Sequence, residues 1–397
     1  IGMMHPPLLK KIVDGIAMSN LANTPFQVHL QNLNGSSPAF ILKHIFTHPQ
    51  TATFNHVVVL NDAEEAAYFY NSIESITGAM DLFYFPSSFK TSQNFSWLNP
   101  SHVMLRTEAL TKLSMGGNKK IVVTYPEAFF EKVIMPKTLQ DNIIQIKTND
   151  TLGLDALMER LVEYGFERTD FVYEPGQFAL RGGIFDIYSF GNEKPYRVEL
   201  FGEEVDSIRL FDPETQLSER KLLQVNIIPN VTTQFEDTIK IPFMEFVPER
   251  TVVWLKDWSL IQQRGNDQLE ALEAFLLHAP ILKITDDADA HKKNTDKDDF
   301  VAVEKVIEQV FNKPIIEWGF QANLTKQKLA FSTQVQPSFN RQFQYLIANL
   351  QEYEKKGYDL FLFAEQAKQL ERLHAIFTDL KTEIQFTPIV KNIHEGF

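Results

Sequence analysis

Apolar residues in the first third of the chain follow two different spacings. Continuous apolar runs, typical of buried strands, occur at residues 56–60, 82–85 and 120–124. Between these runs, apolar residues recur at helical spacing over residues 63–76 and 100–114. Strands that alternate with helices imply crossover connections and a mostly parallel sheet. The pattern therefore predicts an α/β domain of the nucleotide-binding kind.

The pattern changes at about residue 139. A strand is predicted at residues 143–146 and an amphipathic helix at 154–164. Short apolar runs follow, separated by the turn signals Pro175-Gly176, Gly182-Gly183 and Gly202. Short strands divided by such turns are typical of hairpins, so this stretch predicts an α+β module with an antiparallel sheet.

Alternation of strands and helices returns after Pro229. The expected elements are a strand at 251–255, a helix at 258–278, a solvated loop at 286–299 and a helix at 301–311. A final unit is expected with helices at 339–356 and 365–380 and strands at 358–363 and 383–386. This second α/β stretch and its small C-terminal unit complete the predicted architecture.

Composition narrows the possible classes of function. The chain has 397 residues, enough for two to four domains, and no cysteine. The missing thiols exclude disulfides, cysteine-ligated zinc and thiol nucleophiles, and they suit a reducing, cytoplasmic compartment. A formal net charge of −13 argues against a chain that grips nucleic acid by itself, since phosphate binding needs clustered Lys and Arg. No apolar run reaches the length of a membrane span.

A turn at residues 32–40 lies where a phosphate-binding loop would lie. A working loop needs Gly-x-x-x-x-Gly-Lys-Ser/Thr, whose lysine reaches the terminal phosphates and whose hydroxyl holds Mg²⁺. If Gly35 is an additional glycine, the two required glycines fall on Asn32 and Ser37. The lysine position is then Pro38 and the hydroxyl position Ala39. An ordinary surface turn and a decayed phosphate loop both fit this pattern.

Other candidate chemistry is weaker. His44 and His48 are four residues apart, so a helix could present both to a metal, but His-Glu-x-x-His spacing is missing and Pro49 follows. The pair Glu203-Glu204 falls in a turn, where solvated charge is a better interpretation than acid–base chemistry. We therefore expect no catalytic residue, no metal site and no bound cofactor in this chain.

One strand carries an unusual combination on its polar face. In residues 196–201 the side chains alternate, so Tyr196, Val198 and Leu200 form an apolar face and Arg197, Glu199 and Phe201 form the other. Arg181 precedes Gly182-Gly183, and a bulge there would aim it to the side of Arg197. A solvated face with Phe201 under a loop fits the pattern, and so does a recognition patch of Arg181, Arg197 and Phe201.

These motifs have a family resemblance. The segments Gly176-Gln177-Phe178-Ala179-Leu180-Arg181-Gly182, Asp186-Ile187-Tyr188 and residues 196–209 (YRVELFGEEVDSIR) resemble the second domain of the UvrB family. This domain occurs in the excision-repair protein UvrB and in transcription-repair coupling factors (Mfd). The resemblance is strong from residue 177 to 229, moderate in the first α/β stretch and weak from 236 to 333.

Three features favour the coupling factors over UvrB. Pro38 and Ala39 interrupt the phosphate loop that UvrB keeps. Residues 123–126 lead directly into a helix expected at 127–133, without the aromatic hairpin with which UvrB clamps DNA. The last residues, FTPIVKNIHEGF, resemble the end of the third domain of coupling factors. The chain thus resembles the N-terminal, UvrB-like region of a coupling factor, with a UvrB-like ATP-dependent repair enzyme as the alternative.

The resemblance implies a division of the chain and a role for each part. It implies the first half of a degenerate P-loop-NTPase-like parallel-sheet domain at 1–137, an inserted α+β domain at 138–229, the second half at 230–333 and a small α/β domain at 334–397. The inserted domain would bind UvrA through Arg181, Arg197 and Phe201. The RNA-polymerase-binding domain and the DNA translocase, with its ATP and Mg²⁺, would lie beyond Phe397, and a C-terminal domain would mask the patch.

Overall fold

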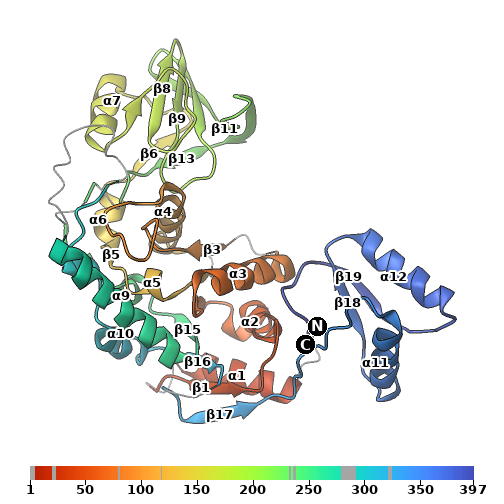
Figure 1. The fold of residues 1–397 in the computed structure, drawn as a ribbon. Helices are drawn as coiled ribbons and strands as arrows, with labels where there is room; N and C mark the ends of the chain where they lie inside the picture. Colours follow the sequence, from red (N-terminus) through yellow and green to blue (C-terminus); the bar gives the residue numbers. More distant parts are fainter. Residues whose placement is uncertain are drawn as a thin grey trace.

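The computed structural model describes residues 5–19, 24–78, 81–117, 119–231, 234–235, 238–278, 292–320 and 324–397. Figure 1 shows a central sheet domain, a module built from residues of the middle of the chain at the top, and a C-terminal unit at the right. None of the helices in these described ranges is long and apolar enough to cross a membrane.

The central domain is built on a seven-stranded parallel sheet. Its strands lie in the order β17-β1-β16-β15-β2-β4-β3. Their bounds are β1 Gln27–Gln31, β2 Asn55–Val59, β3 Leu82–Phe85, β4 Ile121–Thr124, β15 Thr251–Lys256, β16 Ile315–Trp318 and β17 Gln327–Ala330. All neighbouring pairs are parallel. β2 therefore joins β15 in mid-sheet, and two segments almost 200 residues apart form one layer.

Helices complete the core of this domain. They are α1 Pro6–Met18, α2 Ser37–Thr47, α3 Ala63–Thr77, α4 Pro100–Ser114, α9 Trp258–His278 and α10 Val303–Val310. Local signals explain their ends: the Asp62 side chain caps α3 by accepting from the Glu65 N–H at 2.8 Å, and α3 ends at Gly78 with φ of 59°. Strands β2, β4 and β15 are almost entirely buried and consist of near-continuous apolar runs, as the middle of a sheet covered on both faces requires.

Further short elements lie among these strands and helices, several of them where the chain leaves for the next module and returns from it. They are η1 Pro49–Thr51, α5 Pro126–Phe129, β5 Val133–Ile134, α6 Pro136–Asp141, β14 Lys240–Ile241, α8 Phe243–Phe246 and η3 Lys297–Asp299. The helix expected at 127–133 is wrong beyond Phe129, because Val133 and Ile134 pair with β14 instead. A strand partner distant in the chain thus ended the helix earlier than the local pattern indicated.

The module at the top of Figure 1 is the predicted α+β unit. Its six-stranded sheet has the order β12-β11-β10-β9-β8-β7. The strands are β7 Glu167–Arg168, β8 Gln177–Arg181, β9 Ile184–Ile187, β10 Tyr196–Phe201, β11 Glu204–Phe211 and β12 Ser218–Leu222. All pairs are antiparallel except β7 with β8. β6 Ile144–Lys147 pairs with β13 Gln224–Ile227, and α7 Leu154–Glu163 packs beside them.

The C-terminal unit contains α11 Phe343–Lys355, β18 Phe361–Ala364, α12 Ala367–Asp379 and β19 Thr387–Val390. β18 and β19 are parallel, as a βαβ unit requires. The second strand lies four residues beyond the expected 383–386. Ile384 is instead buried in the small core of this unit, with Phe386 packed against it, so the chain reaches the sheet only at Thr387.

The expected solvated loop at 286–299 falls partly outside the described residues, and the prediction is wrong for three of the eight residues 292–299. Lys293, Thr295 and Asp299 are buried. The Asp299 carboxylate accepts from Lys240 Nζ at 2.6 Å and lies 3.4 Å from Lys293 Nζ. Charged residues are buried here because they pair with one another, a condition that composition cannot reveal.

Candidate functional site

Three neighbouring strands bring Arg181 and Arg197 to one carboxylate. Asp186 of β9 lies opposite Arg197 of β10, and its side chain is fully buried. Arg197 Nε donates to Asp186 Oδ1 at 2.8 Å and Arg197 Nη2 donates to Oδ2 at 3.0 Å. Arg181 Nη2 donates to Asp186 Oδ2 at 2.9 Å. One buried negative charge therefore orients two guanidinium groups.

The Gly182-Gly183 turn is what places Arg181 on this side. Arg181 and Ile184 are directly paired across a two-residue hairpin turn, in which Gly182 has φ of 59°. The bulge expected at this position is therefore wrong. Simple strand alternation is sufficient, because Arg181, Ile184 and Asp186 then share one face of the sheet.

Arg197 is largely enclosed. Its guanidinium stacks over the Phe211 ring at 4.3 Å, and its Nη1 donates to the Gln216 carbonyl at 2.8 Å. Only 13% of its side chain is exposed. With two carboxylate bonds, one carbonyl bond and an aromatic face, Arg197 has few donors left for another molecule.

Arg181 and Phe201 are the accessible members of the recognition patch. The Arg181 side chain is 35% exposed and stacks over the Phe171 ring at 4.3 Å. Phe201 is 85% exposed at the end of β10, while on the opposite face Val198 belongs to the core and Leu200 packs against it. Ile184 of β9 lies between the strands that carry the two residues, because it is paired with Arg181 on β8 and with Glu199 on β10. Phe201 lies two residues beyond Glu199, about 7 Å along the strand.

Sequence reasoning missed two residues of this site. Asp186 occurs in the motif, but its role as the common partner of both arginines was not recognised. A carboxylate within the apolar strand 184–187 needs a buried cation, and that signal was available. Phe171 lies between β7 and β8 and is 46% exposed, and no local pattern connects it with Arg181.

The turn at residues 32–36 joins β1 to α2, as a phosphate loop joins a strand to a helix. Pro38 and Ala39 lie in the first turn of α2 and are buried. Gly35 has φ of 54°, which glycine adopts without strain. The Asn34 N–H donates to Thr333 Oγ1 at 2.9 Å, so the turn is held by a residue from the far end of the sheet domain.

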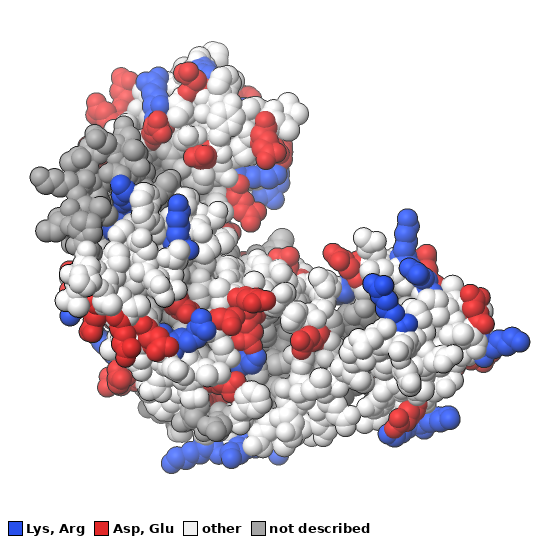
Figure 2. Space-filling view, in the orientation of Figure 1, with Lys and Arg blue, Asp and Glu red and all other residues white. Residues whose placement is uncertain are grey.

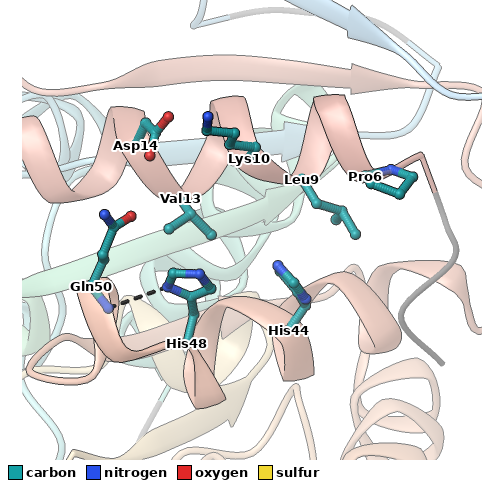
Figure 3. A pocket seen from close by; sticks show the side chains of 8 residues that line it. All are labelled: Pro6, Leu9, Lys10, Val13, Asp14, His44, His48 and Gln50. Atoms are coloured by element: carbon teal, nitrogen blue, oxygen red, sulfur yellow. Dashed lines mark hydrogen bonds between the residues drawn. The ribbon is translucent and has the colours of Figure 1, made fainter.

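His44 and His48 line a cavity of about 390 Å³ between α1 and α2 (Figure 3). Their ring centroids are 5.7 Å apart, and His48 Nδ1 accepts from the Gln50 N–H at 3.2 Å. Burial and the neighbouring His48 lower the pKa of His44. Within the described ranges, no group of three or more potential ligands could hold a metal ion.

Charge is distributed without a basic track on the face shown in Figure 2, where Lys and Arg lie among Asp and Glu. Nucleic-acid binding through phosphates requires clustered basic side chains. On the face that Figure 2 shows, the described residues present no such cluster.

The antiparallel-sheet module resembles a known protein family. Residues 144–232 match the family model of the UvrB interaction domain, a match that contains Arg181, Arg197, Phe201 and Asp186. The chain thus contains a domain of the UvrB interaction class.

Proteins that are similar to this chain over more than residues 144–232 include transcription-repair-coupling factors. The factor of Bacillus subtilis (strain 168) is 29% identical over 279 residues, which are 70% of this chain and 21% of that protein. A factor of Staphylococcus epidermidis is 33% identical over 198 residues, or 49% of this chain and 16% of that protein. The chain covers no more than about a fifth of these relatives. The matches support its assignment to the N-terminal, UvrB-like region of a coupling factor.

Proposed function

We propose that this chain recruits UvrA to stalled transcription complexes for nucleotide excision repair. The observation that carries the proposal is the Arg181–Asp186–Arg197 cluster, with an exposed Phe201 at the end of the strand that carries Arg197, in a segment that matches the UvrB interaction domain. Arginine and aromatic side chains are enriched among the residues that dominate binding energy at protein interfaces.

The two accessible residues have distinct roles in this proposal. Phe201 offers an apolar anchor whose removal from water would favour binding. Arg181 offers a guanidinium that Asp186 and Phe171 already hold in place, so little side-chain freedom would be lost on association. Arg197 acts through Asp186 as a positioning residue, because it is itself enclosed.

The proposal assigns no ATPase to this chain. The buried Pro38 and Ala39 leave the turn at 32–36 without a lysine for the terminal phosphates or a hydroxyl for Mg²⁺. ATP-driven DNA translocation, and contacts with RNA polymerase and DNA, would belong to other parts of the full-length protein. A C-terminal domain would cover the recognition patch until the polymerase is engaged. Titration with ATP and Mg²⁺ tests the first point, and hydrolysis by this chain would contradict it.

The decisive experiment measures UvrA affinity for wild type, Arg181→Ala and Phe201→Ala. Truncating an interface anchor commonly costs about 2 kcal/mol, so each variant is expected to bind at least about 10-fold more weakly. Matched controls are Phe320→Ala, since Phe320 is 96% exposed on the central domain, and Arg372→Ala on the exposed face of α12. Unchanged affinity in both patch variants would contradict the proposed function.

A further inference from the structure

The last residues of the chain lie across the start of α2, where a phosphate loop would hold its ligand. The Ser36 N–H donates to the Glu395 carbonyl at 3.1 Å, and the Glu395 N–H donates to Ser36 Oγ at 3.2 Å. These two bonds join the β1–α2 turn (residues 32–36) to the tail (residues 392–397) in both directions. The tail carbonyl thus receives an N–H group of the kind that binds phosphate oxygens in phosphate loops.

Side chains of helix α3 bind the backbone of the same tail. The Asn392 N–H donates to Ser75 Oγ at 2.9 Å, and the His394 N–H donates to Ser72 Oγ at 3.2 Å. The His394 ring stacks on Tyr68 with centroids 3.8 Å apart and an interplanar angle of 12°. Three serine hydroxyls and one aromatic ring therefore recognise an extended peptide segment.

Close approach at the turn requires glycine. A Cβ atom on Gly35 would lie 2.2 Å from the Gly396 carbonyl oxygen, and the φ of 54° is itself unfavourable for other residues. Beyond this point, Phe397 contacts Phe40 of α2 at 5.4 Å between ring centroids. Phe40 also meets Phe363 of β18 at 5.9 Å, so the tail contact continues into the C-terminal unit.

The turn also holds the segment that leads into the C-terminal unit. Thr333 precedes α11, and its Oγ1 accepts from the Asn34 N–H at 2.9 Å. The Asn34 side-chain amide donates to the Thr333 carbonyl at 3.1 Å, and the Thr333 hydroxyl donates to the Asn32 carbonyl. Three residues of one turn, Asn32, Asn34 and Ser36, therefore bind the chain both before and after the C-terminal unit.

We propose that the β1–α2 turn, together with Ser72 and Ser75, is a peptide-binding site whose ligand is the tail. In this site a peptide backbone takes the place that a nucleotide phosphate would take at a phosphate loop. By holding both ends of the C-terminal unit, the site fixes the position of that unit beside α2 and α3 of the central domain. The site is separate from the recognition patch, and the inference does not depend on UvrA binding.

Hydrogen exchange in the full chain tests the proposal. In Gly35→Ala, the amides of Asn392, His394 and Glu395 should exchange at least about 10-fold faster than in wild type, because they lose their hydroxyl acceptors to a displaced tail. Gly78→Ala is the matched control, since Gly78 has a similar φ of 59° and open space around its Cβ position. Equal protection of the three amides in both variants would overturn the proposal.

A second pair of variants, with milder substitutions, keeps the proposal testable if Gly35→Ala does not fold. Ser36→Ala removes only the hydroxyl that accepts from Glu395, because Ser36 makes no side-chain cap to α2. It should accelerate exchange of the Glu395 amide, whereas Ser101→Ala on the exposed start of α4 should not. Adding ATP and Mg²⁺ to wild type should leave tail exchange unchanged. Faster tail exchange with nucleotide, or no effect of Ser36→Ala, would contradict the assignment of this site to the peptide.

Discussion

Arg197 meets the carboxylate of Asp186 side-on, with Nε 2.8 Å from Oδ1 and Nη2 3.0 Å from Oδ2. This bidentate geometry is the strongest arrangement available to an arginine and a carboxylate. Arg181 binds the same carboxylate from the neighbouring hairpin. The contact residue Arg181 and the positioning residue Arg197 are therefore not independent, since both depend on one buried charge.

Asp186→Asn should destabilise the module around β8, β9 and β10. The substitution leaves Arg197 enclosed without its counter-charge, and removing one partner of a buried ion pair costs about 3 kcal/mol. Hydrogen exchange of the strand amides measures this module separately from the rest of the chain. Asp206→Asn, at an exposed position of β11, is the control. Equal protection in both variants would show that the carboxylate does not organise the site.

Phe201→Ala should leave stability nearly unchanged. The side chain is 85% exposed, so its truncation removes little buried area, and surface changes usually stay within about 0.5 kcal/mol. Denaturant unfolding of the variant and wild type provides the measurement. A loss well above this value would mean that Phe201 supports the fold, and weaker UvrA binding could then not be attributed to a lost contact.

Glu108 should make stability fall as pH rises from 4.5 to about 7. Burial, together with the nearby Glu193, raises the pKa of Glu108 from 4.5 to about 7, although Lys112 opposes the shift. The folded chain then retains a proton that the unfolded chain releases in this window, so the free energy of unfolding decreases with pH. Glu108→Gln removes this slope and should gain stability relative to wild type at about pH 8 but not below about pH 4.5.

Glu108 lies where α4 contacts the turn that carries Glu193, the neighbouring carboxylate that helps to raise its pKa. A Cβ atom at Gly191 would lie 3.2 Å from the Glu108 backbone nitrogen, so α4 touches the turn that carries Glu193. Urea denaturation at both pH values, with the exposed Glu159→Gln as control, tests the effect. An identical Glu108→Gln difference at the two pH values would contradict it.

Gly265→Ala should destabilise the central domain by about 1–3 kcal/mol, because overpacking forces neighbours to move. A Cβ atom at this position of α9 would lie 2.5 Å from the Phe130 ring and 2.9 Å from Val303. Denaturant unfolding measures the cost. Gly153→Ala, where the nearest atom is 4.0 Å away, is the control for adding a methyl group.

Helices of several turns were predicted well from the helical spacing of their apolar residues. The helices expected at 100–114 and 258–278 have those bounds in the structure, because each carries enough turns for its apolar side to be recognised. The three sheet strands β1, β16 and β17 were not recognised from the sequence. They are four or five residues long and contain polar residues, so they are strands only because parallel neighbours pair with them. The domain boundaries after residues 137, 229 and 333 stay predictions.

The sequence by itself determined the two faces of β10, because side-chain alternation is a local property of an extended backbone. It also placed Pro38 and Ala39 at the lysine and hydroxyl positions of a phosphate loop if Gly35 is an additional glycine, an alignment that stays a prediction. Only the tertiary structure decided that Asp186 joins Arg181 to Arg197, and that the tail lies on the β1–α2 turn. Those contacts join residues of separate strands, or residues some 360 positions apart. They stabilise the protein only once the fold has brought both partners together and away from water, so no local sequence pattern reveals them.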